Sequence, residues 1–124
     1  MSNQIQNPND KKFDLVERTS KFGEKIIIFA KKLPENSINR TLINQFVRSG
    51  TSVGANYMEA DCAESKKDFQ HKIAISKKEA KETEHWLRMI STANPDESTE
   101  CEKLWNESHE LVLIFSSIIN KTRV

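Results

Sequence analysis

Hydrophobic residues recur at alternating spacings of three and four positions along most of this 124-residue chain. Such a repeat places one apolar stripe along an α-helix, whereas a half-buried strand would alternate at every second position. The stripe stops and restarts three times, so the pattern predicts four helices. The predicted helices span approximately residues 13–33, 38–63, 66–92 and 95–122.

The boundaries between these segments carry residues that end or cap helices. Pro34 cannot continue a helix from its interior, so it ends the first segment. Ser37 and Asn39 are the predicted caps of the second segment, and Ser65, with an aspartate three positions later, caps the third. Asn94 precedes a proline that suits the first position of the fourth helix. Short connections join antiparallel neighbours, so we predict an all-α, antiparallel, up-and-down four-helix bundle.

The length and the ends of the chain fit one bundle domain. We expect residues 13–124 to form it and the polar residues 1–12 to be a disordered N-terminal tail. No stretch approaches the roughly 18 consecutive apolar residues of a membrane span, and the N-terminus has no export signal. We therefore expect no membrane partner and a cytoplasmic location. There Cys62 and Cys101 would be free, buried thiols.

The second and fourth segments have unusual apolar faces. Gly50 and Gly54 lie within the second, where each costs about 1 kcal/mol relative to alanine. They indicate that another backbone packs closely there, either from a helix of the same chain or from another subunit. The fourth segment is nearly continuously apolar from Leu111 to Phe115, which is wider than one seam needs. Either this helix sits deeper in the core or its surplus face is a contact between subunits, and we favour the homo-oligomer.

Catalytic and metal-binding patterns are weak in this sequence. A di-metal bundle needs two Glu-x-x-His pairs and two further core carboxylates. One such pair occurs, Glu82 with His85, and the helical register turns both toward water. His71 lies about 21 Å along the helix from His85, and His109 is interpreted as a surface histidine. We predict neither enzymatic activity nor a cofactor; a helical-bundle enzyme or metal-binding protein is the alternative.

Charge is unevenly divided along the chain, although the net charge is only +1. The first and third predicted helices carry more Lys and Arg than Asp and Glu, and the second and fourth carry fewer. This alternation fits weak ion pairs between neighbouring helices, and it also allows a basic surface for nucleic acid. The candidate nucleic-acid contacts are Lys31, Lys32, Arg40, Lys66, Lys67, Lys72, Lys77, Lys78 and Lys81.

Residues 42–60 carry a more specific motif. Arg48 is followed by a run of small residues that includes Ser52, and then by Asn56 and Glu59, three positions apart. This segment resembles the signature of bacterial four-helix-bundle proteins encoded in intervening sequences of 23S ribosomal RNA genes. The accessory variability determinant proteins of diversity-generating retroelements are similar. The resemblance covers about residues 13–120 and continues through Ser65, Asp68, Phe69, Glu84 and Leu87.

This resemblance implies a homopentameric ring of four-helix bundles with an accessory or scaffold role. Its retroelement members are positively charged and bind nucleic acid, RNA or DNA, and a reverse transcriptase. This chain departs from them by its net charge of +1. The resemblance also accounts for the glycine-bearing helix as a contact between helices or subunits. Arg48, Asn56 and Glu59 on this helix are expected to form a buried polar contact there, with a contact to a ligand or nucleic acid as the alternative. The candidate interface residues are Arg48, Gly50, Ser52, Gly54, Asn56 and Glu59.

Overall fold

Residues 14–123 are described by the computed structural model, and they form four α-helices joined by short connections. The helices are α1 (Leu15–Lys32), α2 (Ser37–Asp61), α3 (Lys66–Ala93) and α4 (Ser98–Thr122), with a 3-10 turn, η2 (Pro95–Glu97), before α4. No strand occurs within these residues, so the predicted all-α four-helix class is confirmed. The predicted N-terminal tail lies outside the described residues.

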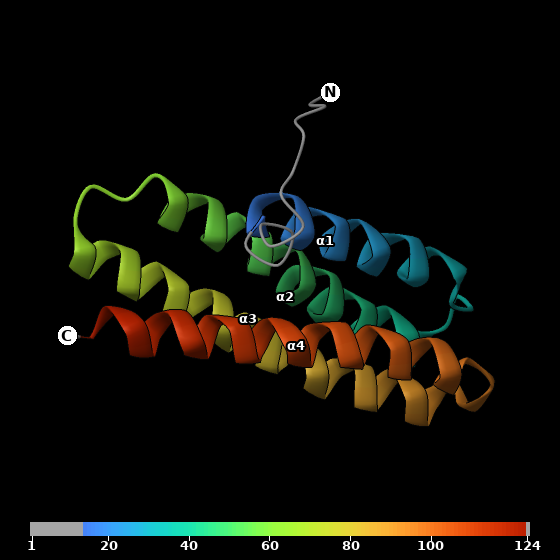
Figure 1. The fold of residues 1–124 in the computed structure, drawn as a ribbon. Helices are drawn as coiled ribbons and strands as arrows, with labels where there is room; N and C mark the ends of the chain where they lie inside the picture. The colour runs from blue at the N-terminus through green and yellow to red at the C-terminus, as the bar shows by residue number, and fades with distance from the viewer. Residues whose placement is uncertain (1–13, 124) are drawn as a thin grey trace.

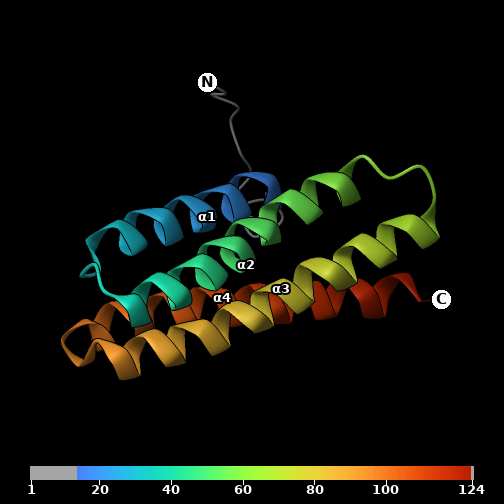
Figure 2. The ribbon, with the colours of Figure 1, turned by 180° about the vertical axis from the view of Figure 1, so that it is seen from behind.

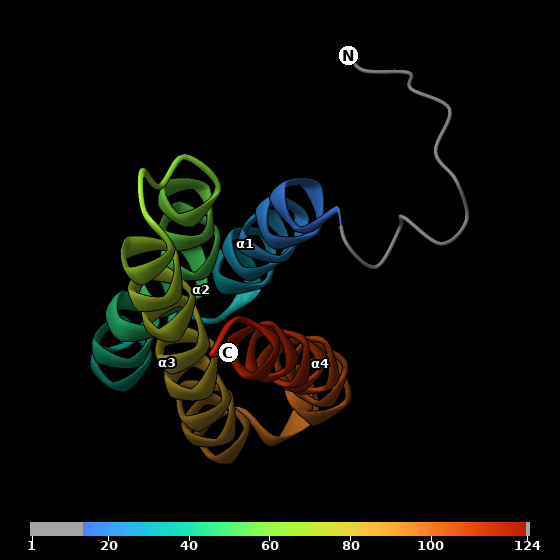
Figure 3. The same cartoon turned by 60° about the vertical axis from the view of Figure 1, so that its left-hand side comes forward.

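Successive helices run antiparallel, as Figures 1 and 2 show from opposite sides. α2 packs extensively against α1 and α3, and α3 against α4, whereas α1 and α4 approach each other far less. α2 and α3 form one side of the bundle, and α1 and α4 the other (Figure 3). In the described part of the chain, no helix is long and apolar enough to cross a membrane.

The helix ends follow local capping chemistry, with two corrections to the sequence prediction. The side chain of Asn36, rather than Ser37 or Asn39, caps α2 by accepting a hydrogen bond from the backbone N–H of Asn39. Asn94 and the following proline open the 3-10 turn, so α4 itself begins three residues later than residue 95. The predicted cap Ser65 does accept a hydrogen bond from the third backbone N–H of α3.

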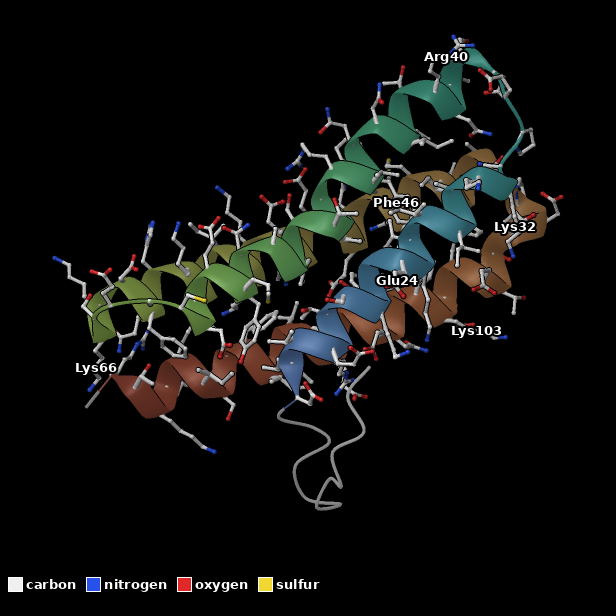
Figure 4. All side chains as sticks on the ribbon, turned by 90° about the horizontal axis from the view of Figure 1, so that it is seen from above. Glu24, Lys32, Arg40, Phe46, Lys66 and Lys103 are labelled. Carbon is white, nitrogen blue, oxygen red and sulfur yellow. The ribbon has the colours of Figure 1, made fainter. Side chains whose placement is uncertain are left out.

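The predicted apolar stripes meet in one core. Phe22, Phe29, Phe46 and Phe115 are at most 1% exposed, and the rings of Phe29 and Phe46 pack edge to face at 6.1 Å. Phe46 projects from α2 toward the interior in Figure 4. These four side chains come from α1, α2 and α4, so the core joins helices that are distant in sequence.

The two cysteines differ in their surroundings. Cys101 is buried on α4, and burial raises the pKa of its thiol to about 11, which keeps it protonated and unreactive. Cys62 is exposed, so the expectation that both thiols are buried is wrong for this residue. The reason is its place at the C-cap of α2, where the chain leaves the core for the connection to α3.

α1 and α2 approach each other closely at the glycines of α2. A Cβ atom added to Gly50 would lie 2.8 Å from both γ carbons of Ile26 on α1, and one added to Gly54 would lie 3.2 Å from the hydroxyl of Thr19. Ile26 is fully buried, so it has little room to move. The glycine face of α2 is therefore occupied by a helix of the same chain.

A pair of buried asparagines joins the two connections at one end of the bundle. Asn39 of α2 and Asn94, which follows α3, exchange two side-chain hydrogen bonds of 3.0 and 2.9 Å. Asn39 also donates to the carbonyl of Pro34, and Asn94 to that of Ile90. Every polar atom that the two amides bury is thereby paired, which ties the α1–α2 connection to the end of α3.

The glycine contacts predict opposite effects for two alanine substitutions. Gly50→Ala gains about 1 kcal/mol of helix propensity but pushes a methyl group into Ile26, which costs about 1–3 kcal/mol, so we expect a net loss of stability. Gly23→Ala, whose Cβ would lie 3.6 Å from its nearest neighbour, should instead gain up to about 1 kcal/mol. Urea unfolding of both variants measures these changes, and equal effects would contradict the close-contact argument.

The asparagine pair predicts that Asn39→Ala lowers the free energy of unfolding by about 1–3 kcal/mol, because it leaves the buried amide of Asn94 without its partner. Asn44→Ala, at an exposed position of the same helix, is the matched control and should change stability by less than about 0.5 kcal/mol. Thermal and urea unfolding give the comparison. A loss no larger than that of the control would show that the pair contributes little.

Candidate nucleic-acid interface

A basic groove runs along the outer surface between α3 and α4. Lys77, Lys78 and Lys81 line it from α3, and Arg123 lines it from the end of α4. The three lysines recur at helical spacing, so their side chains leave α3 on the same flank. The groove has a volume of about 580 Å³, and none of its described lining residues is acidic. We call the groove lined by these four residues the basic groove.

Most of the charge in this groove is not neutralised by neighbouring carboxylates. Within residues 14–123, Lys77, Lys81 and Arg123 form no ion pair. Lys78 is the exception, because it lies close enough to Glu82 to contribute to the lowered pKa of that carboxyl. That pKa is lowered mainly by the hydrogen bond that the Trp86 indole donates, and further by Arg48. Three cations therefore remain available to an anionic ligand.

The other predicted basic residues do not join this groove. Lys31, Lys32 and Arg40 lie at the opposite end of the bundle from Lys66, as Figure 4 shows for Lys32, Arg40 and Lys66. Arg40 also pairs with Glu35 at 3.4 Å. Lys66 and Lys67 open α3, at the α2–α3 connection. The sequence-predicted basic set is therefore spread over both ends of the molecule.

Lys72 is separated from the basic groove in a different way. It leaves the opposite flank of α3, where its ammonium pairs with Glu59 of α2 at 2.6 Å.

The sequence analysis did not identify Arg123, which lines the basic groove together with the three lysines of α3. The antiparallel order of α3 and α4 was the available signal, because it places the end of α4 next to the first half of α3.

The predicted interface residues of α2 contact neighbouring helices of the same chain or their own helix. Arg48 bonds to Glu79 at 3.2 Å and to Glu82, both on α3. Asn56 donates to the carbonyl of Ser52 within α2. Arg48 is exposed in this chain, so its contact with α3 lies at the surface and is not the buried contact between helices that the sequence predicted; a contact between subunits stays a prediction. The reason is that residue 48 flanks the apolar stripe of α2 and is not part of it.

The histidines do not assemble a metal site. Glu82 is bound to Arg48 and Trp86, and the ring of His85 packs against Trp86 at 4.8 Å. No group of three potential metal ligands occurs in the part of the chain that the structure describes. His109 contacts Glu84 of α3 at 3.3 Å and stays partly exposed, in agreement with the surface histidine that the sequence indicated.

Comparison with known proteins places this fold in a family. The 23S rRNA-intervening sequence protein family matches residues 11–117, nearly the whole bundle. The chain belongs to this family. A crystal structure from Bacteroides thetaiotaomicron, described as a protein of unknown function from the S23 ribosomal protein family, is 33% identical to it. The alignment of the two structures covers 85% of this chain and 97% of the chain from Bacteroides, with a TM-score of 0.76.

A comparison with curated proteins gives no match. The similarity to retroelement accessory proteins is tested by none of these findings and stays a prediction. In this member of the 23S rRNA-intervening sequence protein family, the three groove lysines lie inside the matched region and Arg123 lies outside it.

Proposed function

We propose that this protein is a non-catalytic, self-associating four-helix bundle that binds nucleic acid through the basic groove, in an accessory or scaffold role. The observation that carries this proposal is a groove of about 580 Å³ lined by three lysines and an arginine and by no described acidic residue. Lysine and arginine side chains contact phosphates without regard to base sequence, and they displace condensed counterions. The groove therefore suits the backbone of a nucleic acid.

A local cluster can bind phosphates even though the net charge is only +1. At physiological ionic strength, charges are screened beyond about 8 Å, so a ligand in the groove responds chiefly to the side chains around it. The balancing acids lie elsewhere: Glu59 pairs with Lys72, and Glu107 and Glu110 pair with Arg18 between α4 and α1. The near-neutral net charge of the chain therefore does not argue against phosphate binding in the basic groove.

Self-association is supported by apolar side chains that the described bundle leaves exposed. Leu113 on α4 is 56% exposed, and Ile28 on α1 is 60% exposed. Leu113 belongs to the apolar face of α4 that is wider than its own core contact requires. The resemblance of the α2 motif to ring-forming bundles favours five copies.

The basic groove predicts a localised loss of nucleic-acid binding. Lys77→Gln with Lys81→Gln should weaken binding of a single-stranded RNA oligomer at low salt, and lower the slope of log affinity against log salt by about 1 to 2. Lys31→Gln with Lys32→Gln removes the same charge at the far end and is the matched control. Fluorescence anisotropy at several salt concentrations gives both slopes. Equal losses in the two double variants would mean that charge alone, and not the groove, decides binding.

The proposed ring predicts a molar mass in solution of about five times the 14.3 kDa of one chain. Light scattering coupled to size-exclusion chromatography measures it directly. Leu113→Glu should lower this mass if the exposed face of α4 is part of the contact, since it places a charge in an apolar interface. A wild-type mass equal to one chain at all accessible concentrations would contradict self-association.

A further inference from the structure

A second groove lies at the other end of the α3–α4 seam. It has a volume of about 510 Å³, and its lining includes Arg88 and Ser91 of α3 and Thr99, Trp105 and Asn106 of α4. This volume falls in the range of sites that hold small planar ligands. The lining combines one large aromatic ring, one guanidinium and several hydroxyl and amide groups, which is the chemistry that contacts a nucleobase and its phosphate, and it also includes one carboxylate, that of Glu102.

Trp105 is held in place before any ligand arrives. Its ring stacks on the ring of His109, with centroids 4.7 Å apart and planes inclined by 13°. His109 is fixed in turn by Glu84 of α3, a carboxylate that is only 9% exposed, at 3.3 Å. Trp105 nevertheless remains 36% exposed and lines the groove. An aromatic ring ordered on one side and accessible on another is a platform on which a further ring can stack at little entropic cost.

The platform and the basic groove lie on one line. On α3, Lys81 and Arg88 are seven residues apart, so both project from the same flank. Two turns of helix separate them, or about 10 Å. On α4, Asn106 of one groove and Asn120 of the other share a flank in the same way. A single extended strand that follows α3 between Arg88 and Lys81 could therefore contact both grooves and leave Leu113 of α4 to the contact between subunits.

We propose that Trp105 is a base-stacking site for single-stranded nucleic acid, with Arg88 at the phosphate beside the stacked base and the basic groove holding phosphates further along the strand. This inference rests on the proposed function, because it names the class of nucleic acid that the basic groove binds. A duplex keeps its bases stacked on one another, so it cannot offer a base to Trp105 without unpairing. The site therefore selects unpaired strands.

Three ligands test this site: a single-stranded oligoriboadenylate of twelve nucleotides, the same strand paired with its complement, and the same strand with abasic sugars. We expect the wild-type protein to bind the first more tightly than the other two. Trp105→Ala should weaken binding of the single strand at least about fivefold and leave the abasic strand unaffected. Trp105→Phe should restore most of the loss, because a phenyl ring also stacks.

Ile38→Ala is the matched control, since it removes an exposed apolar side chain that lines neither groove. It should leave binding of the single strand unchanged. A direct readout comes from Trp86→Phe, which leaves Trp105 as the one tryptophan of the chain. Its fluorescence should be quenched by the single strand and not by the abasic strand. Circular dichroism of each variant verifies that the bundle remains folded.

The outcomes separate this inference from the proposed function. If the double lysine variant loses affinity for all three ligands while Trp105→Ala binds as well as wild type, the groove stands and the stacking site is wrong. If Trp105→Ala loses affinity and the lysine variant does not, the stacking site stands and the basic groove is wrong. Equal binding of the single and abasic strands by the wild type, or no binding of any strand at low salt, would overturn the inference.

Discussion

The contact between α1 and α2 at Gly50 and Gly54 fixes the first helix on the remaining bundle. Without Cβ atoms on these glycines, α1 comes close enough for Ile26 and Thr19 to pack directly against the α2 backbone. α1 has few other anchors, because it approaches α4 sparsely. Its main polar link to α4 is Arg18, which bonds to Glu107 and Glu110 at 2.5–2.9 Å. The pKa of the Arg18 guanidinium is raised by these bonds, chiefly by the one to Glu107. Close packing on one side and an ion-paired network on the other thus hold α1.

α3 is central to the proposed activity because its two flanks have different electrostatic surroundings. On the flank toward α2, Lys72 meets Glu59, and two glutamates of α3 meet Arg48, so the charges there cancel in pairs. On the flank toward α4, the groove lysines face hydroxyl, amide and apolar groups together with Arg123. One helix therefore contributes both to the cohesion of the bundle and to its positive surface. Short-range screening keeps these two roles independent.

Self-association would change what each groove can achieve. A single site with three or four phosphate contacts binds weakly and is sensitive to salt. Several copies of the site on one assembly raise the effective concentration for a strand that reaches more than one of them, without any new contact. A nearly neutral chain with a modest groove is therefore compatible with useful binding once it is repeated. The exposed apolar residues Leu113 and Ile28 and the basic groove are complementary parts of one proposal.

The sequence by itself determined the helices, their order and the family, because helical periodicity, caps such as Ser65 and the motif from Arg48 to Glu59 are local patterns. It predicted that something packs against Gly50, but only the tertiary structure decided that this is Ile26 of α1. The sequence also identified nine basic residues as candidate nucleic-acid contacts, but it did not show which of them form ion pairs. Which of them stay unpaired depends on the rotation of each helix against its neighbours: Lys72 turns toward Glu59, whereas Lys77 and Lys81 turn toward α4 and Arg123. That rotation is set by side-chain packing between segments far apart in the chain, which no local pattern records.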